Sequence, residues 1–428
     1  MVIKLSLNNI AARTIFILAA AVVCALMVYV ALAGFITGVF SDARYKVDRA
    51  ALVGVVDRFP DSGRLHYRLA QYEMKAVDRD LDRARRHAML AIELSPYDFD
   101  YHLLLASALE AGGDRAAAEA AMREAVRLAP NDMEARWQLA NLLVRRNKLS
   151  ESLPEFRLAN QSNNALLPAS LDLVWRMSDG DAEAVKAVTG EDAASQITLT
   201  RFLLRRSRPE EAVEVFGSVD RAARLQSAES REILGDLIAA GRVDLAREIW
   251  GDLAGIDKTT LIRNPGFEED FFKNFDHFDW KIARSEYARL GVDATSARTG
   301  ERSLLIEFIG RDTTRLSGEV RQLVVLQPNA RYRLTCFVKT QSLTTPEGPR
   351  LSVSDYKTGA LIAESAPVAS GSSDWQAIAL DFTAPQAEKR GGAAVYVSIK
   401  RVPQFKYDDP TKGIVWFDDF NLTAVSGQ

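Results

Sequence analysis

Side chains that commonly carry out chemistry are few in this sequence and widely spaced. The four histidines are His66, His87, His102 and His277, and no two of them stand at metal-ligand spacing. No phosphate-binding loop, dinucleotide fingerprint or nucleophile elbow is present. Carboxylates are numerous, so counting them does not decide whether two face each other as glycoside hydrolysis requires. We therefore predict a protein that is not an enzyme.

The cysteine positions and the net charge argue against a disulfide, a cysteine metal site and a nucleic-acid partner. Cys24 lies in an apolar run and Cys336 in a strand-like run, so neither a disulfide nor a cysteine metal site is expected. The formal net charge is −3, and no basic stripe with interleaved aromatic residues is present. We therefore expect no nucleic-acid partner.

Aromatic residues near the C-terminus are the candidates for ligand binding. Sugar rings present C–H groups that pack on aromatic faces, with polar side chains bonding the rim. Tyr356, Phe405 and Tyr407 stand in loose, polar surroundings, and residues 401–413, "RVPQFKYDDPTKG", have the composition of a binding loop. Trp280 closes the acidic, Phe-rich stretch "EDFFKNFDHFDW". Most of these rings would ordinarily pack in a core, and one or two could instead form a sugar-stacking platform.

The N-terminal part predicts a membrane anchor. A chain of 428 residues exceeds one typical core, so several domains are expected. Residues 1–13 form a short tail, and residues 14–41 contain no charge and are long enough to cross a bilayer. The alternatives are a signal peptide cleaved after Ala31–Ala33 and, more remotely, a buried helix. Lysines and arginines flank the run on both sides, so charge does not fix its orientation.

Residues 45–255 predict a helical repeat. Pro60, Pro96 and Pro130 are spaced by 36 and 34 residues. Between them, small and apolar residues recur at fixed offsets: Leu105–Ala106, Leu109, Gly113, Ala118, Met122 and Ala125, then Leu139–Ala140, Leu143, Asn147, Ser152, Phe156 and Ala159. This pattern resembles the tetratricopeptide repeat, with five to six hairpins stacked as a solenoid. The resemblance implies a concave surface for a protein or peptide partner, and the alternative is a mere spacer. The candidate groove residues are Tyr67, Arg68, Tyr101, His102, Arg136 and Asn141.

Residues 256–428 predict an antiparallel β-sandwich. Short, β-branched segments such as "RYRLTCFVKT" and "AAVYVSIK" alternate with period two and are separated by turn residues. Five motifs follow in order: Asn264–Glu268, Ala297–Phe308, Leu326–Thr340, Asp374–Pro385 and Val415–Leu422. Together they resemble galactose-binding-like jelly rolls, especially carbohydrate-binding modules of families four and nine. The resemblance implies a non-catalytic glycan-binding fold, in which Trp280 matches a position that looks structural.

The same resemblance implies a structural calcium ion. In such jelly rolls calcium ties the first strand to the last through carboxylate and carbonyl oxygens. Glu268 matches the first-strand acid and Asp418 the closing-strand acid, with Asp419 as its alternate and the carbonyl near Gly300 as a further ligand. The alternative is that these acids are solvated or pair with Arg302.

The sequence thus predicts a multidomain α + β chain: a transmembrane helix, an α-solenoid and a jelly-roll β-sandwich. The short link at residues 253–266 predicts that the last repeats dock on the sandwich. A glycan-binding domain suggests a single-pass protein of a bacterial inner membrane, with most of the chain periplasmic, acting in exopolysaccharide or cell-envelope glycan assembly or export. The alternatives are a scaffold whose sandwich binds a protein and no sugar, and a sandwich with two facing catalytic carboxylates.

Overall fold

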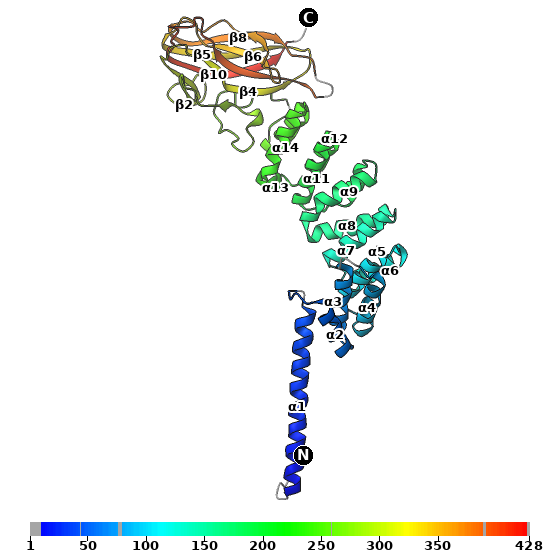
Figure 1. The fold of residues 1–428 in the computed structure, drawn as a ribbon. Helices are drawn as coiled ribbons and strands as arrows, with labels where there is room; N and C mark the ends of the chain where they lie inside the picture. Colours follow the sequence, from blue (N-terminus) through cyan, green and yellow to red (C-terminus); the bar gives the residue numbers. More distant parts are fainter. Residues whose placement is uncertain (1–9, 43, 76–78, 258, 388–390, 426–428) are drawn as a thin grey trace, which may run out of the picture. The chain divides into compact units, whose positions relative to one another are not determined.

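A computed structural model describes residues 10–42, 44–75, 79–257, 259–387 and 391–425 (Figure 1). The chain divides into two compact units, Met1–Gly190 and Glu191–Gln428. The second unit contains both the last helices of the repeat and the whole β-sandwich. The division therefore falls inside the helical region and not where helices give way to strands.

The first element is the apolar helix α1 (Ile10–Ser41). Within it, Arg13–Ser41 has a mean hydropathy of 2.9, and none of its most apolar window is buried in the structure. By length and composition this helix could cross a membrane, and a signal sequence near the N-terminus would have the same properties.

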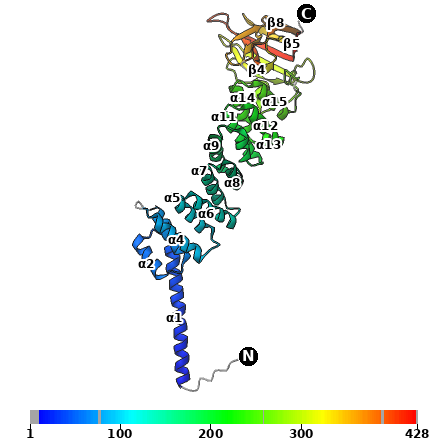
Figure 2. The same cartoon turned by 90° about the vertical axis from the view of Figure 1, so that its right-hand side faces the viewer.

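The repeat region consists of paired antiparallel helices, seen from two directions in Figures 1 and 2. The short helix α2 (Arg49–Arg58) precedes the pairs. In the first unit the pairs are α3 (Gly63–Lys75) with α4 (Leu81–Leu94), α5 (Phe99–Ala111) with α6 (Arg115–Leu128), α7 (Met133–Arg145) with α8 (Leu149–Ser162), and α9 (Leu167–Met177) with α10 (Ala182–Ala187). In the second unit they are α11 (Ala193–Arg205) with α12 (Pro209–Ser218), and α14 (Ala228–Ala239) with α15 (Val243–Ala254), separated by the short α13 (Arg221–Gln226). The predicted tetratricopeptide-type repeat is confirmed. Residues 160–190, which match the repeat pattern poorly, form the end of α8 and the α9–α10 hairpin.

The sequence specifies these hairpins through caps and turns. Aspartates cap several helices, as when the Asp114 carboxylate accepts the Ala117 N–H of α6 at 3.0 Å. The turns inside the hairpins require a left-handed residue, and Gly113, Asn147, Ser207 and Gly241 have φ between 59° and 89° at this position. Small residues such as Ala106 are fully buried where the helices meet.

One position of the repeat has a structural role that the sequence did not reveal. His66, His102 and Arg136 stand six residues after Pro60, Pro96 and Pro130. In each case the side chain donates to the carbonyl of that proline, at 2.8, 3.1 and 2.6 Å respectively. His102 and Arg136 were candidate groove residues, and these bonds give them a role in fixing the loop before each first helix.

The C-terminal domain is a sandwich of two five-stranded antiparallel sheets, as predicted. The β4 sheet has the order β1-β4-β9-β6-β7, and the β10 sheet has the order β2-β3-β10-β5-β8. The strands are β1 (Lys281–Ile282), β2 (Ala288–Asp293), β3 (Ser303–Ile309), β4 (Leu316–Leu326), β5 (Arg331–Thr344), β6 (Arg350–Asp355), β7 (Leu361–Glu364), β8 (Gly371–Thr383), β9 (Ala393–Arg401) and β10 (Lys412–Ala424).

The two sheets enclose one core, because alternate residues of each strand point inward. Ile306 and Phe417 of the β10 sheet and Val395 and Val397 of the β4 sheet belong to it. Cys336 is buried in this core, which raises the pKa of its thiol well above the ordinary value. Neither it nor Cys24 forms a disulfide, as expected.

A second core joins the last hairpin to the outer face of the β4 sheet, within the second unit. Leu323 and Ala394 point outward from β4 and β9 and pack with α14 and α15. The Phe-rich segment, residues 269–280, fills the space between them: Phe275 and Phe278 are buried beside Trp250. The Trp250 indole N–H donates to the Phe275 carbonyl at 2.5 Å. The predicted docking of the last repeats on the sandwich is therefore confirmed, and the rings of Phe275 and Phe278 are buried between the two.

The junction predicts a strong response to one added methyl group. A Cβ at Gly391 would lie 1.8 Å from the Gly241 carbonyl oxygen, in the α14–α15 turn. We expect Gly391→Ala to force that turn away from the sandwich and to lower the free energy of unfolding by about 1–3 kcal/mol, as measured by urea denaturation. Gly291→Ala is the matched control, since a Cβ there meets nothing within 4 Å. Equal stability of the two variants would contradict the observed contact.

Candidate ligand-binding loop and its support

Two of the four aromatic candidates share one loop. Residues 402–411 connect β9 to β10, and the side chains of Phe405 and Tyr407 are 55% and 80% exposed. Val402 is exposed beside them in the sequence. Large apolar rings so exposed on an ordered loop are suited to contacting another molecule.

The loop is held by an ion pair that is completely buried. Arg401, at the end of β9, pairs with Asp409, and both side chains are inaccessible to solvent. The Arg401 guanidinium also donates to the carbonyls of Thr314 and Glu347, at 2.6 and 3.0 Å. The Asp409 carboxylate accepts the Phe405 N–H at 2.7 Å. The pair therefore fixes the backbone that carries Phe405.

Electrostatics at Asp409 favours the charged pair. Burial alone would raise the pKa of the Asp409 carboxyl group. The N–H of Phe405 and the guanidinium of Arg401 more than offset this and hold its pKa below the ordinary value. A buried pair with its remaining donors satisfied is costly to break, so the loop is preorganised and not free to collapse.

The other two aromatic candidates lie elsewhere. Trp280 is only 2% exposed and packs between Phe267 and Phe420, with ring centroids 5.4 and 4.8 Å away. Its ring has no face for a sugar, so the structure excludes it as a stacking platform. Tyr356 is half-buried against the core shared by the helices and the β4 sheet. The four residues therefore do not form one site.

The predicted calcium ligands do lie together, beside residues 297–302. The Asp418 carboxylate accepts the N–H of Arg298 at 2.7 Å and that of Asp419 at 2.7 Å. The Glu268 carboxylate accepts the N–H groups of Glu301 and Arg302, at 3.0 and 2.9 Å. Gly300 is needed here, because its φ is +64° and a Cβ would lie 2.3 Å from a Glu268 oxygen.

The carboxylates of this cluster also pair with neighbouring side chains. The Asp419 carboxylate accepts from the Arg298 guanidinium and from the Thr299 hydroxyl, both at 2.5 Å. Burial raises the pKa of Asp418, although its N–H donors oppose the shift. The described residues contain no group of three or more histidine, cysteine or acidic side chains placed to hold a metal. Because N–H donors and a guanidinium surround the carboxylates, these side chains as placed do not fit the calcium ion that the resemblance implies, and we expect the cluster to be stable without one.

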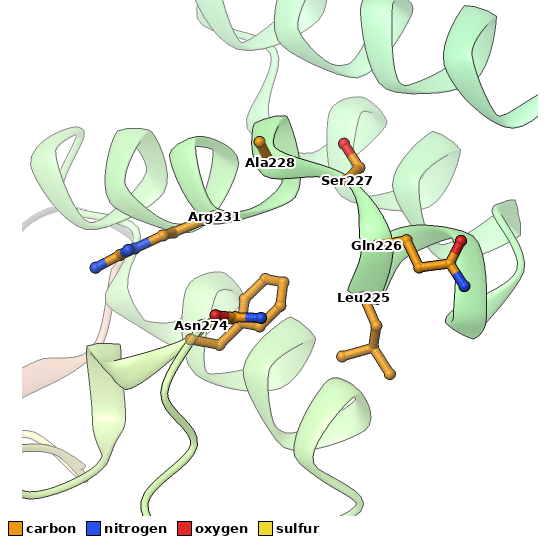
Figure 3. A pocket seen from close by; sticks show the side chains of 7 residues that line it. Leu225, Gln226, Ser227, Ala228, Arg231 and Asn274 are labelled. Atoms are coloured by element: carbon orange, nitrogen blue, oxygen red, sulfur yellow. The ribbon is translucent and has the colours of Figure 1, made fainter.

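A cavity of about 280 Å³ lies where the corner between α13 and α14 faces the Phe-rich segment. Figure 3 shows the side chain of Arg231 pointing away from Leu225 and Asn274. Arg231 pairs with Asp276 at 3.2 Å. The lining residues are Leu225, Gln226, Ser227, Ala228, Arg231, Asn274 and Phe275. Among the described lining residues Arg231 is the one that is charged, so the cavity has few groups that could recognise a charged ligand.

Comparisons with known proteins give only distant likenesses. No family model and no curated protein matches the sequence. YrrB, "a TPR protein with an unusual peptide-binding site", is 15% identical with a TM-score of 0.29 and covers 47% of this chain and 99% of its own. The CBM22-1 xylan-binding domain of Paenibacillus barcinonensis Xyn10C is 18% identical with a TM-score of 0.25. The match covers 38% of this chain and 93% of that domain.

The Stig cyclase Fisc from Fischerella sp. TAU is also 18% identical, with a TM-score of 0.27, covering 39% of this chain and 97% of its own. The likenesses thus include peptide-binding, xylan-binding and catalytic proteins. At TM-scores this low, none of them bears on the function of this chain.

The buried ion pair predicts a large stability effect. We expect Asp409→Ala to lower the free energy of unfolding by about 3–5 kcal/mol, because it leaves the Arg401 charge buried without its partner. Asp381→Ala is the matched control: it removes the acid of an exposed pair with Arg333 and should leave the free energy of unfolding nearly unchanged. Urea denaturation of both variants measures the difference. A cost for Asp409→Ala no larger than that of the control would show that the pair does not anchor the loop.

The carboxylate cluster predicts stability that does not depend on metal. We expect the melting temperature of the protein to be the same in calcium and in chelator. Asp418→Ala should lower the free energy of unfolding by about 1–3 kcal/mol, since buried N–H groups lose their acceptor. Asp374→Ala, at an exposed acid, is the control. A melting temperature that rises with calcium and falls with chelator would instead support the metal site.

Proposed function

We propose that this chain is a membrane-anchored, non-enzymatic scaffold whose β-sandwich binds a glycan. The observation that carries the proposal is the pair of exposed rings, Phe405 and Tyr407, on a loop fixed by the buried Arg401–Asp409 pair. A preorganised aromatic surface loses little entropy on binding and offers faces for the C–H groups of sugars. Lys406 and Asp408 alternate with the rings along the loop and supply polar groups for the sugar rim.

The helical repeats would hold a protein or peptide partner. Stacked hairpins present a continuous surface made of their first helices. On this surface Tyr67 packs against Tyr101, with ring centroids 5.0 Å apart, and Tyr67 remains partly exposed. A chain that binds a glycan at one domain and a protein at another raises the effective concentration of each near the other.

The location we propose is a bacterial inner membrane, with the helix Arg13–Ser41 as a single span and most of the chain in the periplasm. Exposed apolar side chains all along α1 favour a lipid environment for it. Glycan binding outside the cytoplasm then suggests a role in exopolysaccharide or cell-envelope polysaccharide assembly or export. No catalytic step is part of this proposal.

A glycan array probed with the full chain in detergent tests the proposal. We expect binding to at least one envelope-type polysaccharide. Phe405→Ala and Tyr407→Ala should each weaken it by about tenfold, since loss of a stacked ring costs about 1.5 kcal/mol. Tyr97→Ala is the control, because Tyr97 is 83% exposed but lies in the helical repeat.

The same experiment distinguishes glycan binding from the alternative, a sandwich that binds a protein and no sugar. If no glycan binds, and the same two substitutions abolish capture of a protein partner, the sandwich is a protein-docking domain and the glycan proposal is wrong. If a bound glycan is shortened over time, the protein is an enzyme and the non-enzymatic part of the proposal fails.

A further inference from the structure

A smaller cavity, of about 180 Å³, lies between α14 and the outer face of the β4 sheet, within the second unit. Ile238 of α14 and Leu323 of β4 form apolar parts of its wall. Its polar lining consists of His277 and Asp279 from the Phe-rich segment, Lys281 of β1, Arg321 of β4 and Tyr396 of β9. Unlike the cavity in Figure 3, this one has two cationic side chains in its wall, from the neighbouring strands β1 and β4.

The two cations of the cavity stand side by side on the sheet. Lys281 and Arg321 are directly opposite each other in the antiparallel β1–β4 pair, so their side chains share one face of the sheet. Like charges in this position repel and destabilise a sheet. A negatively charged ligand bound in the cavity would reduce the repulsion between these two side chains.

The acids nearby do not neutralise these cations fully. Asp276 accepts both Lys281, at 3.4 Å, and Arg231, at 3.2 Å. The Asp279 carboxylate is turned to the backbone, where it accepts the N–H groups of Phe272 and Trp280 at 2.9 and 2.8 Å. The described residues of the cavity wall therefore include two cationic side chains, Lys281 and Arg321, and one carboxylate, Asp279, which is occupied by backbone N–H groups.

Arg321 is the group without a protein partner. Among the described residues it makes no ion pair or hydrogen bond, and its guanidinium lies over the Tyr396 ring, 4.7 Å from the centroid. Stacking on an aromatic face holds a guanidinium plane in place while leaving its N–H fork free. That fork matches the geometry of a carboxylate.

His277 lies in the same wall and has a buried ring nitrogen. Its Nδ1 is buried and has no hydrogen-bond partner within the described part of the chain. Burial lowers the pKa of the imidazole to about 4, so it is neutral at ordinary pH and can donate or accept one bond.

We propose that this cavity binds a uronate, a sugar ring bearing a carboxylate, within an acidic polysaccharide. The Arg321 fork would hold the carboxylate with Lys281 beside it, and Tyr396, Leu323 and Ile238 would enclose the ring. The volume is below the roughly 300–1,000 Å³ of pockets for drug-sized ligands, so one sugar unit is accommodated and not a long stretch of polymer. The inference rests on the proposed glycan binding and specifies its class.

Calorimetric titration of the full chain in detergent tests the inference. The probes are short oligosaccharides of galacturonate, glucuronate and mannuronate, each paired with its carboxyl-reduced, neutral counterpart. We expect at least one acidic oligosaccharide to bind more than tenfold tighter than its neutral counterpart, with an affinity that falls as salt rises.

Substitutions then assign the binding to the cavity. Arg321→Gln should weaken the acidic ligand by about ten- to a hundredfold and leave the neutral one unchanged. Arg321→Lys should restore only part of the affinity, because an ammonium lacks the planar fork. Arg289→Gln is the matched control: it removes the same charge from β2 of the same domain and should have no effect. Arg321→Gln should also melt no lower than the unaltered protein, since it relieves the repulsion from Lys281.

The outcomes separate this inference from the function on which it rests. Acidic and neutral oligosaccharides that bind equally, or an Arg321→Gln variant that binds the acidic one unchanged, would overturn the uronate site and leave glycan binding intact. The same holds if only Phe405→Ala and Tyr407→Ala reduce binding. If no saccharide of either kind binds, both the site and the proposed function are wrong.

Discussion

The packing of Trp250, on the last helical hairpin, against the Phe-rich segment holds the hairpin to the sandwich in the second unit. The Phe-rich segment contains several aromatic rings whose exposure to water would be unfavourable. On the outer face of the β4 sheet, Leu323 and Ala394 are apolar and are covered by this segment and the last hairpin. Each surface buries the other. At about 2–3 kcal/mol for each large side chain removed from water, the rings at this junction contribute a substantial share of a domain's net stability.

The chemistry of the domain follows from this packing. Once α14 lies on the β4 sheet, Arg321, Lys281 and His277 line a partly open pocket and not a bare sheet face. The loop with Phe405 and Tyr407 depends on a different device, the buried Arg401–Asp409 pair. One site is therefore built by docking helices on a sheet, and the other by a charge pair that ties a loop to its own strand.

Much of the architecture could be predicted because periodicity is local. Three- and four-residue spacing identified the repeat hairpins, and period two identified the strands. The partners of individual residues could not be predicted, because they depend on contacts distant in sequence. The Phe-rich segment was expected to be buried, but nothing in it indicated Trp250. Trp280 and Phe405 are both aromatic residues near charged neighbours, and only the fold shows that one is core and the other exposed. The two-unit division after Gly190 likewise has no signal in the repeat pattern.

Hydrogen exchange of the full chain, resolved to single segments, tests the central claim that the last hairpin and the sandwich form one cooperative unit. The account predicts that the amides of α14 and α15 and those of β4 and β9 open with the same free energy, and that Trp250→Ala lowers this value for both together. If α14 and α15 exchange at a separate, lower free energy, and Trp250→Ala leaves the strands unaffected, the hairpin is only the end of the helical repeat and the account is contradicted.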